Sequence, residues 1–216
     1  KNMGGWFDYR SAKIGFRDYG HCMGWGLGDF NADGRIDLVM ADLGPHPLYL
    51  QKSVKSDGGL EFVDSARSWH LVASTWGVSG WSPLVADFDH DGRVDVYLGT
   101  SGVVPKSEMA VWAPCLEVKN LPPQHDLLYL NRGGWFEASR TMAVKDPLVM
   151  PGVMVQSLLD IDDDGDLDIV QVRPEGRARV LRNDMKKQGG SVVVRLVGKG
   201  GNSSAIGARV VAQVGC

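Results

Sequence analysis

The chain has 216 residues, 44% of them hydrophobic, and a formal net charge of −3. This composition suits a globular protein with a hydrophobic core, and the charge gives no broad basic surface for nucleic acid. No run of about 18 apolar residues occurs, so the sequence predicts no membrane span. The three cysteines (Cys22, Cys115 and Cys216) form no Cys-x-x-Cys pair; zinc and redox motifs are therefore unsupported, and the disulfide state stays open.

The N-terminal segment repeats a pattern found later in the chain. Residues 2–11 read NMGGWFDYRS and match 131–140, NRGGWFEASR. We expect both to form the fourth strand of a four-stranded unit, so residues 1–20 hold the last strand of a preceding unit and a linker. Trp6 and Trp135 occupy one slot of this repeat and are expected in the core.

The next segment, 21–76, is predicted to be a complete unit of four strands. Its strands are expected at 24–30, 36–41, 47–52 and 60–67. These runs are short, rich in β-branched or aromatic residues, and bounded by Gly, Asp, Asn and Pro, which is typical of strands. No long stretch has a helical period.

Two further units follow in the same order. The unit 77–151 has predicted strands at 82–88, 94–99, 126–132 and 131–140, and an insertion at 101–125 that contains four prolines. Such a long loop either carries function or packs as an ornament. The unit 152–190 has predicted strands at 153–161, 167–172 and 178–183, and residues 191–216 form a separate C-terminal segment.

Four short antiparallel strands per unit are typical of a β-propeller blade. The sequence therefore predicts an all-β fold made of propeller blades. A closed ring needs at least about four blades, so this chain is too short to close one alone. Either it is a piece of a longer protein, as its start at Lys1-Asn2 also indicates, or further blades come from other subunits.

An acidic motif, Asp-x-Asp/Asn-x-Asp-Gly-x-x-Asp, joins the first two predicted strands of each unit, at 29–37, 87–95 and 160–168. We number each loop from its first Asp. Positions one, three and five offer side-chain oxygens, the Gly at six permits positive φ, position seven offers a backbone carbonyl, and the Asp at nine closes the shell. Such an all-oxygen site favours calcium over magnesium. It is not an EF-hand, because position twelve lacks Glu and the flanks are strands.

The sequence thus predicts three calcium sites, in which Arg35, Arg93 and Asp166 act through their backbone carbonyls. The predicted ligands are Asp29, Asn31, Asp33, Arg35 and Asp37 in the first loop, Asp87, Asp89, Asp91, Arg93 and Asp95 in the second, and Asp160, Asp162, Asp164, Asp166 and Asp168 in the third.

The alternative for any one loop is a solvated turn in which Asp side chains bond nearby amides. Three matching copies favour a cation, because close exposed carboxylates repel by roughly 1 kcal/mol per pair in water. The first loop has one charge fewer, so we expect its calcium affinity to be the lowest. His90, at position four of the second loop, is predicted to face solvent, and His46 is predicted to lie on the surface.

The acidic loops and their flanking strands resemble the FG-GAP/VCBS repeats of integrin-type β-propellers, over residues 2–184. In that family the nine-residue loop joins the first two strands of a blade and binds calcium, which implies calcium ligands at the positions given above. Residues 191–216 resemble the start of the ASPIC/UnbV segment, which often follows such repeats in secreted proteins. Without that resemblance, 191–198 and 208–214 are two predicted strands joined by a polar turn.

No Gly-x-Ser-x-Gly elbow, phosphate loop or His-Glu-x-x-His motif occurs in the sequence. The sequence therefore predicts a non-catalytic, calcium-binding module that interacts with a protein or a glycan, in an extracellular, cell-surface or periplasmic location. One alternative is the scaffold of a secreted polysaccharide-acting enzyme, with catalytic groups in 101–125 or outside this chain. Another is a structural subunit of an extracellular assembly.

Overall fold

The computed structural model describes residues 4–5, 9, 11–16, 20–54, 59–72, 79–100, 125–139, 153, 155–172 and 178–211. Several sequence-based expectations fall outside these ranges: most of the fourth strand near 4–10, the insertion at 101–124, and Trp6, Cys115 and Cys216. One short 3-10 helix, η1 (Ser11–Ile14), precedes the strands. The described strands are β1 (Gly24–Gly28), β2 (Asp37–Ala41), β3 (Leu48–Val54), β4 (Leu60–Asp64), β5 (Gly80–Ala86), β6 (Asp95–Thr100), β7 (Leu127–Asn131), β8 (Phe136–Ser139), β9 (Val155–Leu159), β10 (Asp168–Val172) and β11 (Ala178–Leu181).

The strands form three antiparallel sheets, each built from strands consecutive in sequence. Sheet 1 has the order β1-β2-β3-β4, sheet 2 the order β5-β6-β7-β8, and sheet 3 the order β9-β10-β11. The predicted all-β fold of four-stranded antiparallel units is confirmed. In each sheet the acidic loop joins the first two strands, whose pairing starts beside the loop, as in Gly28↔Asp37 and Ala86↔Asp95.

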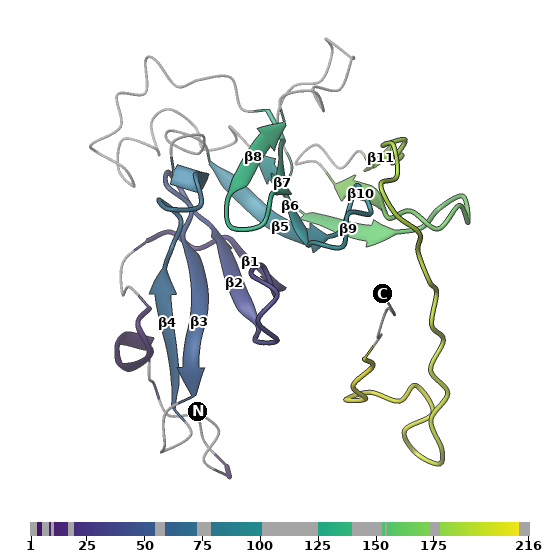
Figure 1. Cartoon of the computed structure of the whole chain (residues 1–216), viewed down its shortest axis with the longest axis horizontal. Helices are drawn as coiled ribbons and strands as arrows, with labels where there is room; N and C mark the ends of the chain where they lie inside the picture. Colours follow the sequence, from purple (N-terminus) through teal and green to yellow (C-terminus); the bar gives the residue numbers. More distant parts are fainter. Residues whose placement is uncertain are drawn as a thin grey trace.

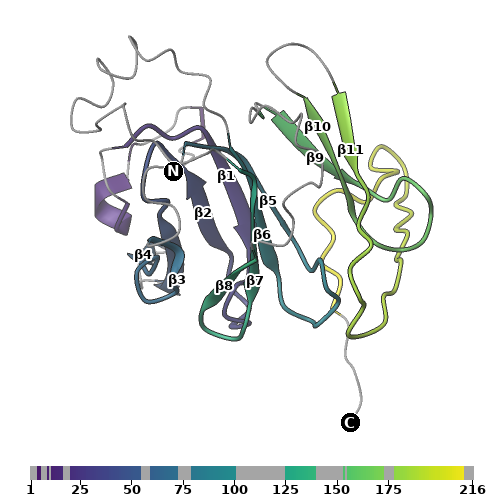
Figure 2. The same ribbon diagram turned by 90° about the horizontal axis from the view of Figure 1, so that it is seen from above.

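The sheets stack side by side through their first strands, with β5 against β1 and β9 against β5. Figure 1 shows the three sheets following one another, and Figure 2 shows the same order from above. This arrangement is that of adjacent propeller blades that do not close into a ring.

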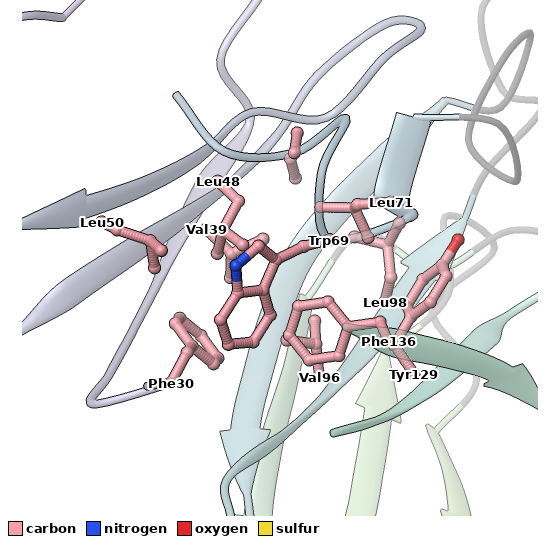
Figure 3. Packing of buried hydrophobic residues seen from close by; sticks show 12 residues of the cluster. Phe30, Val39, Leu48, Leu50, Trp69, Leu71, Val96, Leu98, Tyr129 and Phe136 are labelled. Atoms are coloured by element: carbon pink, nitrogen blue, oxygen red, sulfur yellow. The ribbon is translucent and has the colours of Figure 1, made fainter. Parts of the chain in front are cut away.

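The larger core lies between sheets 1 and 2 (Figure 3). Trp69, which follows β4, packs on Phe136 of β8 with ring centroids 5.3 Å apart, and Phe30 meets the same ring edge-on at 5.7 Å. Val96 and Leu98 of β6 complete this face of sheet 2. A single sheet has little apolar surface to bury by itself, so this contact supplies much of what stabilises both sheets.

Sheet 2 is also buried on its other face. Tyr97 lies between Val96 and Leu98 in β6. Because successive side chains of a strand point to opposite faces, Tyr97 packs toward sheet 3, with Phe88 and Ile169. Asp126 sits at this junction and accepts hydrogen bonds from Tyr97 Oη, Gln171 Nε2 and Arg179 Nη2, each at 2.9 Å. Both apolar packing and a polar network therefore hold sheet 3 on sheet 2.

Three sequence-based expectations about buried and exposed residues are wrong. Trp135 is 42% exposed, because its neighbour Phe136 takes the inward side of β8. His46 is only 1% exposed, and its Nδ1 accepts a hydrogen bond from the Asp42 amide. The third is His90, which faces sheet 3 rather than solvent and lies 3.1 Å from Asp166.

The C-terminal segment also differs from its predicted hairpin. Residues 191–211 contain no strand, and Val192, Val197 and Ile206 are more than three-quarters exposed. Local turns order it instead: the Asn202 side chain accepts a hydrogen bond from the Ile206 amide and donates one to its carbonyl. A run of Val residues forms a strand only where a neighbouring strand bonds its backbone groups. Across the part of the chain that the structure describes, no helix is long and apolar enough to cross a membrane.

Candidate metal centres

The three acidic loops lie at corresponding corners of the three sheets. Loop 1 (29–37) joins β1 to β2, loop 2 (87–95) joins β5 to β6, and loop 3 (160–168) joins β9 to β10. The loops that repeat in the sequence therefore occupy equivalent positions in the three sheets.

Each loop contains two residues in the left-handed backbone region. The Gly at position six has φ between 79° and 87° in all three loops. For Gly34 and Gly92 a Cβ would have nothing within 4 Å, so Gly is needed for conformation rather than for space. Position four is also left-handed, with φ of 55° at Ala32 and His90 and 58° at Asp163. A non-Gly residue in this region carries strain, and nothing in the sequence pattern indicated it.

The carboxylate at position one organises its own loop. Asp87 Oδ1 accepts a hydrogen bond from the Asp91 amide at 3.0 Å, and its Oδ2 accepts one from the Gly92 amide at 2.9 Å. Asp29 and Asp160 accept the same pair of bonds in their loops. These bonds curl the loop around the carboxylate, and each oxygen keeps lone-pair capacity for a cation.

The Asp at position nine is buried and ties its loop to the third strand. Asp95 is 0% exposed; its Oδ2 accepts from the Phe88 amide at 2.9 Å and its Oδ1 from the Asn131 amide at 2.8 Å. Asp37 and Asp168 repeat this pattern. The Asp at position nine therefore connects the loop to the sheet by hydrogen bonds and is also a candidate ligand.

The structure gathers some predicted ligands and not others. In loop 2 the carboxylates of Asp87, Asp89 and Asp95 have ligand atoms within 4.8 Å of one another, and in loop 3 those of Asp160, Asp162 and Asp168 do so. These are positions one, three and nine. In loop 1 position three is Asn31, whose Nδ2 donates to Asp33 at 2.8 Å, so this loop has one carboxylate fewer at that point.

Position five is not part of this set of carboxylates. Asp91 Oδ1 accepts from the Arg93 amide, and its Oδ2 pairs with Arg93 Nη2 at 2.5 Å. Asp33 and Arg35 make the same contacts in loop 1. The side chain at position seven thus neutralises position five in these two loops. Whether the backbone carbonyl at position seven is a ligand stays a prediction.

The surroundings of Asp89 show whether the side chains of loop 2 could bind a cation. Its side chain is only 3% exposed, and its Oδ2 contacts Arg132 Nη1 at 3.1 Å and Gln188 Nε2 at 2.6 Å. Its Oδ1 is buried and has no hydrogen-bond partner among the described residues. A buried carboxylate oxygen without a partner is costly, and a cation beside Asp87 and Asp95 would satisfy it. The donor set therefore fits a hard divalent ion.

Burial raises the pKa of Asp95 to about 7; the charges of Asp89 and Asp91 add to this effect, and the amides of Asn131 and Phe88 oppose it. Burial likewise raises the pKa of Asp37, again against two amide hydrogen bonds. Burial and neighbouring negative charges disfavour the charged form of these carboxylates. A bound cation would offset both effects.

Two features of these sites were missed from sequence. His90 at position four reaches across to loop 3, where its Nε2 lies 3.1 Å from Asp166 Oδ1, an atom that also lies 2.7 Å from Lys187 Nζ. The second feature is a buried Asn at the end of the third strand, Asn131 as the last residue of β7 and Asn183 two residues after β11. Both segments, LLYLNR and ARVLRN, contain the Asn, but it is the fifth residue of one and the sixth of the other, which obscured the match.

Residues 11–98, fewer than half of the chain, match the family model described as FG-GAP-like repeat. Three vertebrate proteins, each named cartilage acidic protein 1, are similar to part of the chain. The mouse protein is 36% identical over 95 residues, the human protein 35% over 95 residues, and the Xenopus tropicalis protein 35% over 80 residues. These alignments cover 43%, 43% and 37% of this chain but only 14%, 14% and 11% of the relatives. Loops 1 and 2 and the strands that flank them thus lie in a segment with the sequence of an FG-GAP-like repeat.

Proposed function

We propose that the chain is a calcium-binding, non-catalytic β-propeller module that interacts with a protein or a glycan outside the cell. The observation that carries the calcium assignment is the buried Asp89 Oδ1, which lacks a hydrogen-bond partner among the described residues and lies in a cluster with Asp87 and Asp95. The FG-GAP-like repeat supports the same assignment for loops 1 and 2.

In this proposal, the carboxylates at positions one, three and nine hold the ion in loops 2 and 3. Bound calcium supplies positive charge at the corner of each sheet and offsets the repulsion among the buried carboxylates. Its role is to fix the loop between the first two strands. The similarity to cartilage acidic protein 1 supports an extracellular location, where free calcium is plentiful enough for sites of modest affinity.

Isothermal titration calorimetry of the chelator-treated whole chain tests the calcium assignment. We expect binding in loops 2 and 3 at least, loss of one site in Asp89→Ala, and loss of a different site in Asp162→Ala. The matched control is Asp184→Ala, at an exposed Asp outside the loops that pairs with Arg182; it should leave the stoichiometry unchanged. An absence of binding at about millimolar calcium, the level of extracellular modules, would refute the assignment.

The interaction part of the proposal needs separate measurements. The calcium-loaded chain should bind members of a panel of extracellular matrix proteins or glycans, and chelation should weaken this binding because the loops lose their fixed shape. If the purified chain instead cleaves a panel of polysaccharides, the non-catalytic assignment fails.

A further inference from the structure

Asn131 connects the acidic loops of two different sheets. The residue is 0% exposed and lies at the end of β7, in sheet 2. Its Nδ2 donates a hydrogen bond of 2.8 Å to the carbonyl of Phe30, which is position two of loop 1. Its backbone amide donates one of 2.8 Å to Asp95, which is position nine of loop 2. One buried residue thus bonds to both loops.

Asn183 makes the same connection one sheet further on. Its Nδ2 donates a hydrogen bond of 3.0 Å to the Phe88 carbonyl in loop 2, and its amide donates one of 2.7 Å to Asp168 in loop 3. Its Oδ1 accepts from the Met185 amide, as Asn131 Oδ1 accepts from the Gly133 amide. Each Asn is therefore held at both ends of its side-chain amide.

The two connections join into one path, because Phe30 and Phe88 are themselves bonded to position nine of their own loops. The Phe30 amide donates to Asp37, and the Phe88 amide donates to Asp95. The carbonyl that accepts the bond from each Asn side chain shares a peptide group with the amide of the next residue. That next residue is at position three of its loop, Asn31 or Asp89. The path therefore passes beside candidate ligands in every loop.

We propose that calcium binding in one loop raises the calcium affinity of the neighbouring loop, through Asn131 between loops 1 and 2 and through Asn183 between loops 2 and 3. The proposal rests on the calcium assignment made above and adds how the sites influence one another. An ion that fixes one loop also fixes the peptide unit that the Asn bonds, so less ordering remains for the next ion.

The two junctions should differ in strength. At the junction of sheets 2 and 3, His90 Nε2 contacts Asp166, and the Gln188 side chain and amide both contact Asp89. At the junction of sheets 1 and 2, the residues in the slots of His90 and Asp166 are Ala32 and Arg93, which cannot form that pair. Loops 1 and 2 therefore depend on Asn131, whereas loops 2 and 3 have additional links.

Calcium titration with only loops 1 and 2 active isolates the first junction. The Asp162→Ala variant serves as background, and the affinity of loop 1 is measured with loop 2 intact and with loop 2 disabled by Asp89→Ala. We expect the loss of loop 2 to weaken calcium binding at loop 1 about tenfold, within the usual range of coupling between sites. In an Asn131→Leu background the same loss should leave the affinity of loop 1 unchanged.

The matched control is Asn202→Leu. Asn202 also bonds the backbone through both atoms of its amide, but with Ile206 in the exposed C-terminal segment. This substitution should preserve the tenfold effect. If loop 1 binds calcium with the same affinity whether loop 2 is intact or disabled, with no substitution beyond those that disable loops 2 and 3, the proposal is overturned.

A second measurement avoids any substitution at Asn131, in case that variant does not fold. In the Asn31→Ala, Asp162→Ala chain only loop 2 keeps its full ligand set. Added calcium should slow hydrogen exchange at the Gly34 amide, which bonds Asp29 Oδ2 at 2.7 Å in loop 1. Unchanged exchange there, with calcium bound in loop 2, overturns coupling but leaves the calcium assignment intact. An absence of binding in every loop of the unsubstituted chain overturns both.

Discussion

At the scale of single residues, His46 is a buried neutral side chain in a loop that looked exposed in sequence. It is 1% exposed, and the Asp42 amide donates to its Nδ1 at 3.2 Å, which requires that nitrogen to be unprotonated. A Cβ placed on Gly80 would lie 2.6 Å from His46 Nε2, so Gly80 makes room for the ring. Burial lowers the pKa of His46 to about 3.

This lowered pKa predicts a loss of stability in acid. The unfolded chain binds a proton at His46 below about pH 6.5, whereas the folded chain does not until about pH 3. The free energy of unfolding should therefore fall by up to about 1.4 kcal/mol per pH unit between these values. Urea unfolding at several pH values measures the slope. The slope should shrink in His46→Gln and persist in His125→Gln, a substitution of an exposed His; equal slopes in both variants would contradict the prediction.

Residues such as His46 and His90 show where the sequence stops informing the site. The repeated Asp positions could be aligned because they recur in register, so the candidate ligands were readable without a structure. Whether a loop side chain faces solvent depends instead on the sheet packed beside it. His90 meets Asp166, which lies in another repeat, and no pattern within one repeat predicts that contact.

At the scale of the element, the acidic loop keeps its shape through backbone geometry as well as through hydrogen bonds. Gly92 has φ of 86° with open space around its Cα, so replacing it with Ala adds conformational strain and no clash. Gly92→Ala should lower the free energy of unfolding of the calcium-free chain by about 1 kcal/mol. Gly201→Ala is the control, since Gly201 has open space without a positive φ. A similar loss in both variants, measured by chemical unfolding, would refute the geometric explanation.

Strands could be predicted from sequence where each had a partner nearby in the chain. Hairpins β1–β2 and β5–β6 follow from apolar runs on either side of a loop with fixed turn residues. The segment 191–198 is as rich in β-branched and apolar residues, yet Val192 and Val193 are each 85% exposed and form no strand. The described part of its predicted partner, 208–211, follows a turn region that Asn202 closes locally.

At the scale of the whole molecule, each sheet depends on its immediate neighbours. Sheet 2 is buried on both faces, whereas the outer face of sheet 3 exposes Val155, Val172 and Val180 by 44–60%. Exposed apolar residues on a sheet face are typical of a surface that another unit covers. Among the described residues, this outer face of sheet 3 is therefore more exposed than either face of sheet 2.

If stability is a sum over neighbouring contacts, damage at one junction should stay local. Ile169 is 2% exposed and packs between sheets 2 and 3, so Ile169→Ala should cost about 2–4 kcal/mol. Val172→Ala, on the exposed face of the same strand, should cost less than about 1 kcal/mol. Hydrogen exchange should accelerate in β9–β11 of the Ile169 variant while β1–β4 keep their protection, because sheet 1 packs on the face of sheet 2 opposite to the one that Ile169 contacts. Equal acceleration in all three sheets would instead mean that they unfold as one cooperative unit.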